Sequence, residues 1–208
     1  MLLLRLSVSR LGICTRTLAT SASDAAAGKR GKKQKPEPVV DDRPVDVSRL
    51  DIRVGRIVSV DKHPNADSLY VEQVDCGDAG GKHRSVVSGL VKHVPIEKVG
   101  NRLAVLLCNV KESKMRGQPS QAMVLCASTA EKVEMLDPPA NSQPGDRVVC
   151  QQFSGSPDMY VSMTKVWEPV SKLLTVSANG QVVYDGHPLE VEGKGPITAS
   201  TLRNVPIK

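Results

Sequence analysis

Three cations lie close together among short polar side chains near the middle of the chain. Lys111, Lys114 and Arg116 all fall within residues 109–123. Lysine and arginine on a fixed frame, with neutral hydrogen-bonding groups beside them, suit the holding of phosphate oxygens. On composition alone, a solvated surface loop that is basic by chance is the competing interpretation. The candidate contact residues in this segment are Asn109, Lys111, Lys114, Arg116, Ser120 and Gln121.

Two more candidates border this cluster. Ser88 follows a predicted strand, where its hydroxyl could meet a sugar or a phosphate, although a simple strand exit is the alternative. Met115 has a cation on each side, so we expect it to lie against a base or a ribose, whereas methionine is more often core filler. The predicted site therefore has a cationic centre with Ser88 and Met115 at its edge.

Two apolar runs, residues 102–108 and 122–127, flank the cationic segment and are predicted strands. A sheet that contains both runs would hold the two ends of the segment close together. Gly117 and Pro119 disfavour a helix between them. The sequence therefore predicts a surface loop that presents the three cations to water.

The preceding part of the chain predicts three further strands and a helix. Residues 50–60 alternate, with Ile52, Val54, Val58 and Val60 expected on one side and Gly55 expected at a bulge. Residues 69–75 and 84–88 follow as strands, and a short helix is expected from near Pro95 to Gly100. Five strands with a helix between the third and the fourth is the order of a small Greek-key barrel of the oligonucleotide-binding type. Periodicity alone supports only a small all-β barrel or sandwich.

Beyond the barrel, the pattern predicts a small β-rich segment. A short helix is expected at residues 131–136, and a turn at residues 144–146 leads into residues 147–150. Residues 181–184 and 187–191 are expected to form a β-hairpin around Asp185-Gly186, because Asp-Gly favours a tight hairpin turn.

The formal net charge of +6 is concentrated at the N-terminus. Residues 1–35 contain eight basic residues and one acidic residue, so the remaining chain carries a net charge of −1. Global basicity is therefore no evidence that the folded part binds a polyanion, and only a local patch can serve. The chain has only five aromatic residues, so it cannot rely on stacking bases over several rings, and we expect recognition through phosphate, sugar and shape.

The N-terminal residues predict a targeting segment followed by a linker. Residues 1–23 contain three arginines and no acid, with leucines to one side of a helix, as in a mitochondrial transit peptide. We therefore expect the mitochondrial matrix, with the cytoplasm as the alternative. Residues 24–44 are expected to be a basic, disordered linker that adds auxiliary RNA contacts. Its cations are Lys29, Arg30, Lys32, Lys33 and Lys35.

The sequence favours a protein that is not an enzyme. No catalytic constellation or phosphate-cradling glycine loop is present, and the five cysteines and four histidines show no metal-site spacing. We accordingly expect no cofactor and no metal. No apolar run approaches the roughly 20 residues that span a bilayer, so we expect no membrane association.

Several motifs resemble one family, the tRNA-binding domains of endothelial monocyte-activating polypeptide and of the synthetase-complex-interacting multifunctional protein. Related domains form the C-terminal part of some tyrosyl- and methionyl-tRNA synthetases. The resemblance covers most of residues 45–208. It is carried by residues 45–51, 53–57, 62–70 and 86–90, by Lys114-Met115-Arg116-Gly117 with Ser120-Gln121-Ala122-Met123, and by residues 144–146 and 193–195.

The resemblance implies a tRNA-binding barrel at residues 45–150 and a C-terminal extension at residues 151–208. In the family this extension packs on the barrel and imitates a dimer interface, which implies a monomer. The implied function is non-catalytic binding of tRNA on behalf of an aminoacyl-tRNA synthetase, with tRNA and a synthetase as the implied partners. A cytokine-like role is one alternative, because residues 53–59 resemble the family's active heptapeptide. A scaffold role in a multi-synthetase complex is the other, although the family's long helical arm is missing.

Overall fold

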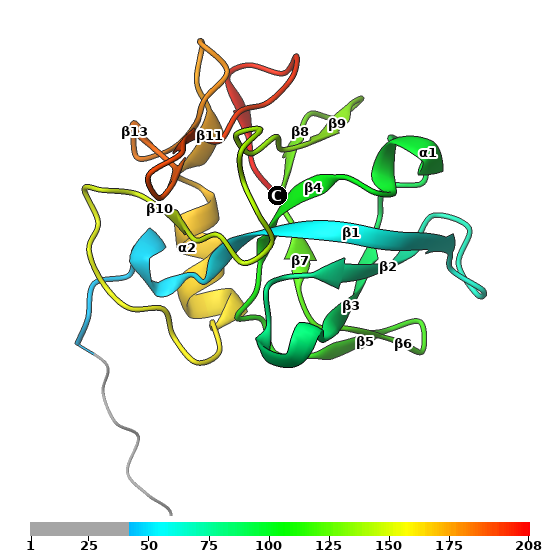
Figure 1. The fold of residues 1–208 in the computed structure, drawn as a ribbon. Helices are drawn as coiled ribbons and strands as arrows, with labels where there is room; N and C mark the ends of the chain where they lie inside the picture. Colours follow the sequence, from blue (N-terminus) through cyan, green and yellow to red (C-terminus); the bar gives the residue numbers. More distant parts are fainter. Residues whose placement is uncertain (1–41) are drawn as a thin grey trace, which may run out of the picture. The chain divides into compact units, whose positions relative to one another are not determined.

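A five-stranded antiparallel sheet forms the first half of the structure, a computed structural model that describes residues 42–208 (Figure 1). The strands run in the order β3-β2-β1-β4-β7, as expected for the predicted barrel. The predicted targeting segment and most of the predicted linker, up to Asp41, lie outside the described residues. The strands of the sheet are β1 (Ile52–Lys62), β2 (Tyr70–Asp75), β3 (His83–Ser88), β4 (Leu103–Leu107) and β7 (Met123–Val124).

The helix between the third and fourth strands of the barrel is present as predicted. It is α1 (Ile96–Val99), which begins after Pro95 and ends at Gly100, whose N–H donates to the carbonyl of Ile96. At the β3 edge of the sheet, Gln121 N–H donates to the carbonyl oxygen of Ser85 at 2.8 Å. The chain that leads into β7 therefore returns to β3, and the sheet is nearly closed into a barrel.

The first strand bends at a different residue from the predicted one. The pairing of β1 with β2 shifts register between Ile57 and Ser59, so Val58 is 46% exposed, and the predicted alternation through Val58 is wrong. Gly55 is instead a position of close packing. A Cβ there would lie 2.7 Å from Leu106 Cδ1, so glycine lets β1 approach its neighbours inside the barrel.

Two hydrophobic clusters share the barrel strands. On β4, Ala104 and Leu106 face the barrel interior, whereas Val105 and Leu107 face a second cluster on the other side. All four residues are at most 1% exposed. The second cluster includes Trp167 from the C-terminal segment, so that segment covers an apolar outer face of the barrel.

The C-terminal segment is built from short strands and one helical stretch (Figure 1). A π-helical turn, η3 (Met163–Trp167), continues directly into α2 (Glu168–Ser171). The predicted hairpin is present, with Asp185 and Gly186 at φ values of 49° and 81° in its turn. The other strands are β10 (Val148–Val149), β11 (Leu174–Val176), β12 (Val182–Tyr184), β13 (His187–Pro188), β14 (Glu190–Val191), β15 (Gly195–Pro196) and β16 (Val205–Pro206).

The helix predicted at residues 131–136 is wrong. The chain there forms β9 (Val133–Met135), which pairs with β8 (Cys126–Ser128). Thr129 sets the reversal, because its N–H donates to the carbonyl oxygen of Lys132 and its hydroxyl accepts from the N–H of Lys132. These local bonds close a hairpin turn and leave no room for a helical one.

The barrel and the C-terminal segment interlock. Strand β10, which precedes the predicted boundary at residue 150, pairs with β14 of the extension. Lys208 exchanges two backbone hydrogen bonds with Cys126, at 2.8 and 2.9 Å. Residues 42–208 accordingly form one compact unit.

Candidate nucleic-acid interface

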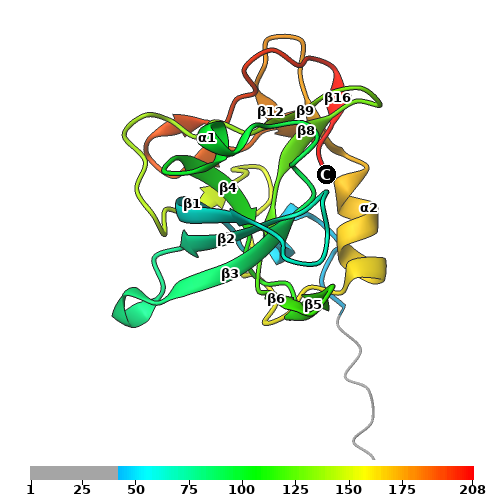
Figure 2. The same cartoon turned by 90° about the vertical axis from the view of Figure 1, so that its right-hand side faces the viewer.

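The cationic segment forms a β-hairpin, where the sequence predicted only a loop. Strands β5 (Ser113–Met115) and β6 (Gln118–Ser120) are joined by Arg116 and Gly117, and Figure 2 shows them beside β3. Both turn residues have positive φ, 52° and 96°, as in the type I′ turn that suits two-residue hairpins. An arginine rarely adopts this conformation. The turn therefore holds a cation at a position where asparagine or glycine would fold more readily.

Four of the predicted contact residues lie on the surface of this hairpin or of its approach. Lys111, Lys114, Met115 and Arg116 are all exposed. None of the three cations forms an ion pair with another described residue. Their charges are thus available to an external anion.

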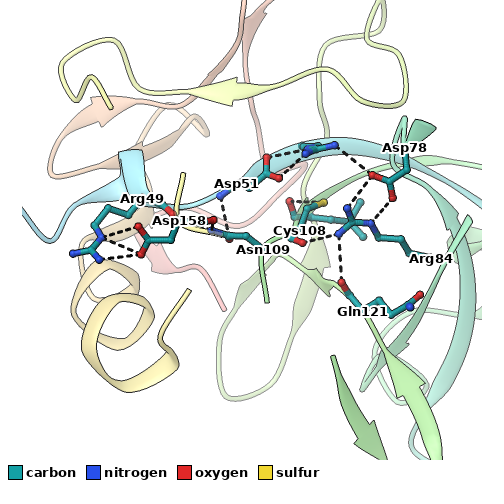
Figure 3. A network of polar contacts seen from close by, with 10 residues as sticks. Arg49, Asp51, Asp78, Arg84, Cys108, Asn109, Gln121 and Asp158 are labelled. Carbon is teal, nitrogen blue, oxygen red and sulfur yellow. Dashed lines mark hydrogen bonds and ion pairs between the residues drawn. The ribbon is translucent and has the colours of Figure 1, made fainter. Parts of the chain in front are cut away.

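Asn109 is buried and its amide is fully used inside the protein. Its Oδ1 accepts from the backbone N–H of Asp51, and its Nδ2 donates to the carbonyl oxygens of Arg49 and Asp158, at 3.0 Å each (Figure 3). The prediction that Asn109 contacts the nucleic acid directly is therefore revised. Asn109 fixes the chain at the start of the cationic segment.

Ser120 and Gln121 also have internal partners. Ser120 Oγ accepts from the N–H of Val87 and donates to the carbonyl oxygen of Ala122. Gln121 Oε1 accepts from the N–H of Ser85, and its Nε2 donates to Glu112. These side chains attach the hairpin to β3, so we assign them a positioning role in place of the predicted direct contact.

Ser88 belongs to the barrel interior as well. Its hydroxyl donates to Glu72 Oε1 at 2.5 Å. Glu72 is fully buried, its Oε2 has no partner within the described structure, and burial raises the pKa of its carboxyl to about 7. The predicted contact of Ser88 with a sugar or phosphate is thus replaced by a bond to a buried acid.

An arginine–aspartate pair supports the base of the hairpin (Figure 3). Arg84 holds both carboxylate oxygens of Asp78, at 2.6 and 2.9 Å, and donates to the carbonyl oxygen of Cys108. The hydrogen bond from Arg84 lowers the pKa of Asp78 below its ordinary value. Asp78 therefore stays ionised and holds Arg84 against the strand that leads into the cationic segment.

The far side of the hairpin is held by a histidine. His63 is 5% exposed, its Nδ1 accepts from the N–H of Asn65, and its Nε2 lies 3.1 Å from the carbonyl oxygen of Met115. Because Nδ1 accepts, Nε2 carries the proton and donates to Met115. His63 is thus a buried structural residue that holds the hairpin.

The predicted site faces three separate hollows. A largely apolar hollow of about 470 Å³ is lined by Ser88, Lys111 and Met115. A polar hollow of about 700 Å³, so named because most of its lining residues are charged or polar, also includes Lys111, together with Asn109 and Gln121. Arg116 lines a third hollow, of about 550 Å³, with Lys92 and residues 65–69. Lys111 is therefore the one predicted contact residue common to the first two hollows, whereas Arg116 lines the third.

Sequence reasoning missed four residues beside these hollows. Lys92 accompanies Arg116, and Lys82, Met159 and Tyr160 line the polar hollow with Lys111. The two lysines lie far from the cationic segment in sequence, so no local spacing connects them to it. Tyr160 could have been singled out from the sequence only because the chain has so few aromatic residues.

Within residues 42–208, the structure has no helix that is long and apolar enough to cross a membrane. The same residues contain no cluster of three or more histidine, cysteine or acidic side chains placed to hold a metal ion.

Comparison with known proteins places the chain among tRNA-binding domains. Residues 52–147 match the family model described as "Putative tRNA binding domain". The chain is 53% identical over 178 residues to "Aminoacyl tRNA synthase complex-interacting multifunctional protein 1" of Cricetulus griseus. The aligned region covers 85% of this chain and 49% of that protein. It is 49% identical over 181 residues to the cytoplasmic methionine–tRNA ligase of Caenorhabditis elegans. Here the aligned region covers 86% of this chain and 19% of that enzyme.

A solved structure matches as well. The crystal structure of the C-terminal domain of Plasmodium vivax p43 superposes with a TM-score of 0.74 at 32% identity, over 79% of this chain and 100% of that domain. By contrast, the chain spans about half the length of the first curated relatives, 49% and 57%.

Proposed function

This chain belongs to the tRNA-binding domain family, and from that premise we propose that it is a non-catalytic protein that binds tRNA and assists an aminoacyl-tRNA synthetase. The observation that carries the proposal is the exposed set of cations Lys111, Lys114 and Arg116, which form no ion pair within residues 42–208. Lys114 and Arg116 belong to the hairpin, whose backbone is fixed by its own ladder, by His63 and by Gln121. Lys111 lies on the approach to the hairpin, which Asn109 fixes. A fixed arrangement of cations can measure the spacing of phosphates on a folded RNA, whereas a mobile one cannot.

The test is the affinity of the full chain for folded tRNA and for an unstructured RNA of equal length. Replacing Lys111, Lys114 and Arg116 with alanine should weaken tRNA binding and remove the preference for the folded RNA. Thermal stability should hardly change, because exposed charges contribute little to folding. Equal tRNA affinity in this variant would refute the site.

A matched control separates the site from the total charge. Replacing Arg56, Lys98 and Lys172 with alanine removes the same charge from exposed positions that line none of the hollows described above. This variant should lose little affinity and keep the preference for folded tRNA. If both variants lose affinity equally, binding depends on net charge alone.

We also propose that the protein acts as a monomer in the mitochondrial matrix. The acid-free, arginine-containing residues 1–23 support import, and the extension that covers the outer barrel face supports a monomer. Residues 1–28 fused to a fluorescent reporter should direct it to mitochondria, and a diffuse cytosolic signal would refute import. Light scattering of the full chain tests the monomer.

The cytokine-like alternative gains no support from the structure. Residues 53–59 lie within β1, where Val54 and Ile57 are completely buried. A receptor could reach them only after the barrel had opened.

A further inference from the structure

One exposed aromatic side chain borders the candidate site. Tyr160 is 63% exposed and its neighbour Met159 is 86% exposed, whereas the next residue, Val161, is 4% exposed. All five aromatic residues of the chain lie within residues 42–208, and the other four are buried or half-buried. Among residues 42–208, Tyr160 is thus the one exposed phenylalanine, tyrosine or tryptophan ring.

The exposure of this ring is imposed by the frame. Asn109 bonds the chain on both sides of residues 159 and 160, because its Nδ2 donates to the carbonyl oxygen of Asp158 and its own carbonyl accepts from Val161 N–H at 2.7 Å. The carboxylate of Asp158 is in turn 3.0 Å from the guanidinium of Arg49. Figure 3 shows this clamp of Arg49, Asp158 and Asn109. Met159 and Tyr160 therefore project from a pinned backbone.

The ring borders the polar hollow of about 700 Å³ together with Lys82 and Lys111. Both lysines are exposed and form no ion pair with another described residue. The carboxylates in this lining are engaged by partners within the protein. Asp51 bonds Arg53, Asp78 bonds Arg84, Asp158 bonds Arg49 and Glu112 accepts from Gln121.

We propose that Tyr160 stacks on one unpaired nucleobase of the bound tRNA while Lys82 and Lys111 hold the adjoining phosphates. Met159 lies beside the ring as an adaptable apolar contact. The combination of an aromatic face with exposed cations matches the two parts of a nucleotide, a flat base and a charged phosphate. A single ring provides one such stack, so shape and phosphate contacts still dominate. This proposal rests on the proposed function and adds the C-terminal segment to the RNA-binding surface.

The experiment compares the full chain with its Tyr160→Ala and Tyr160→Phe variants. The ligands are folded tRNA and a blunt-ended RNA duplex without unpaired nucleotides. Tyr160→Ala should bind tRNA about tenfold more weakly, as expected for the loss of one base stack, whereas Tyr160→Phe keeps the ring and should stay within about twofold. Neither variant should alter binding of the duplex, which offers no free base.

The outcomes separate this proposal from the proposed function. If Tyr160→Ala binds tRNA normally while the Lys111, Lys114 and Arg116 triple variant does not, the stack is wrong and the function stands. If the unaltered chain has no affinity for tRNA, the function itself fails. A loss in Tyr160→Phe equal to that in Tyr160→Ala would assign the effect to the hydroxyl and overturn the stack. A Tyr160→Ala chain that keeps tRNA binding but loses a synthetase partner would overturn it in favour of a protein contact.

Discussion

The imidazole of His63 donates from Nε2 to the carbonyl oxygen of Met115 across 3.1 Å, which joins the turn after β1 to the cationic hairpin. The two residues are 52 positions apart in sequence. This bond is made to β5, whereas Gln121, which follows β6, bonds β3. The hairpin is thus held from both sides, and its cations have a defined spacing.

We expect His63→Ala to loosen the hairpin and weaken tRNA binding several-fold. Because His63 is buried and hydrogen-bonded at both ring nitrogens, its removal should also cost about 1–3 kcal/mol of stability. Hydrogen exchange at the amides of residues 113–120 should accelerate more than exchange in β2. His93→Ala at an exposed position is the control. Unchanged exchange in the hairpin would show that His63 does not hold it.

We expect Arg116→Asn to separate folding from binding. Asparagine adopts positive φ more readily than arginine and forms the favoured Asn-Gly type I′ turn, so the variant should unfold at an equal or higher temperature. It also removes one exposed cation, so tRNA affinity should fall. Parallel measurement of Tm and Kd tests this prediction. A lower Tm would mean that the arginine stabilises the turn through contacts of its own.

Glu72 should make stability depend on pH. Its folded pKa of about 7 lies above its ordinary value of 4.5, so the folded chain binds the proton more tightly than the unfolded chain. The stabilising effect of this group is complete below about pH 4.5 and is lost as pH rises through 7, by roughly 3 kcal/mol in total.

Glu72→Gln, which cannot ionise, should therefore lack this decline. Urea unfolding at pH 5 and pH 8 should show the variant gaining stability relative to the unaltered chain as pH rises. Glu97→Gln, at an exposed position, is the matched control. A variant whose stability relative to the unaltered chain is the same at both pH values would contradict a raised pKa.

Deleting residues 29–35 should lower affinity for all polyanions alike and flatten the salt dependence of binding. Each phosphate contact contributes a slope of about 0.9 in log K against log salt for a duplex and about 0.7 for a single strand. The preference for folded tRNA should survive, because it belongs to the fixed hairpin. Titrations at several salt concentrations check both parts. If the deletion abolished the preference, the barrel would be a passive carrier.

Local signals predicted the barrel well. The strand order follows from apolar runs separated by glycine and proline, α1 from Pro95 and Gly100, and the hairpin at Asp185 from its Asp-Gly turn. The hairpin at Arg116 was predicted only as a loop, because arginine gives no signal for a type I′ turn. The helix predicted at residues 131–136 failed because Thr129 closes a turn that helical periodicity does not report.

The candidate site was only half predictable. Exposed cations on a matched motif could be identified from the sequence. The internal roles of Asn109 and Ser88 could not, because each depends on a partner that only the fold brings close, such as Asp158 and Glu72. Short polar side chains look alike in a sequence whether they face water or a buried carbonyl. Tyr160 depends on the same kind of distant contact, through the clamp at Asn109.

The residues of β4 are divided between two hydrophobic clusters, and this couples the unfolding of the barrel to that of the extension. Neither cluster can be lost without exposing one face of that strand, so the barrel and the extension should unfold in one calorimetric transition. A destabilising substitution at Trp167 would then reduce the number of RNA-competent molecules without altering the affinity of those that remain. Titrations of such a variant would show a smaller active fraction at an unchanged Kd, and damage in the extension would mimic a fall in protein abundance.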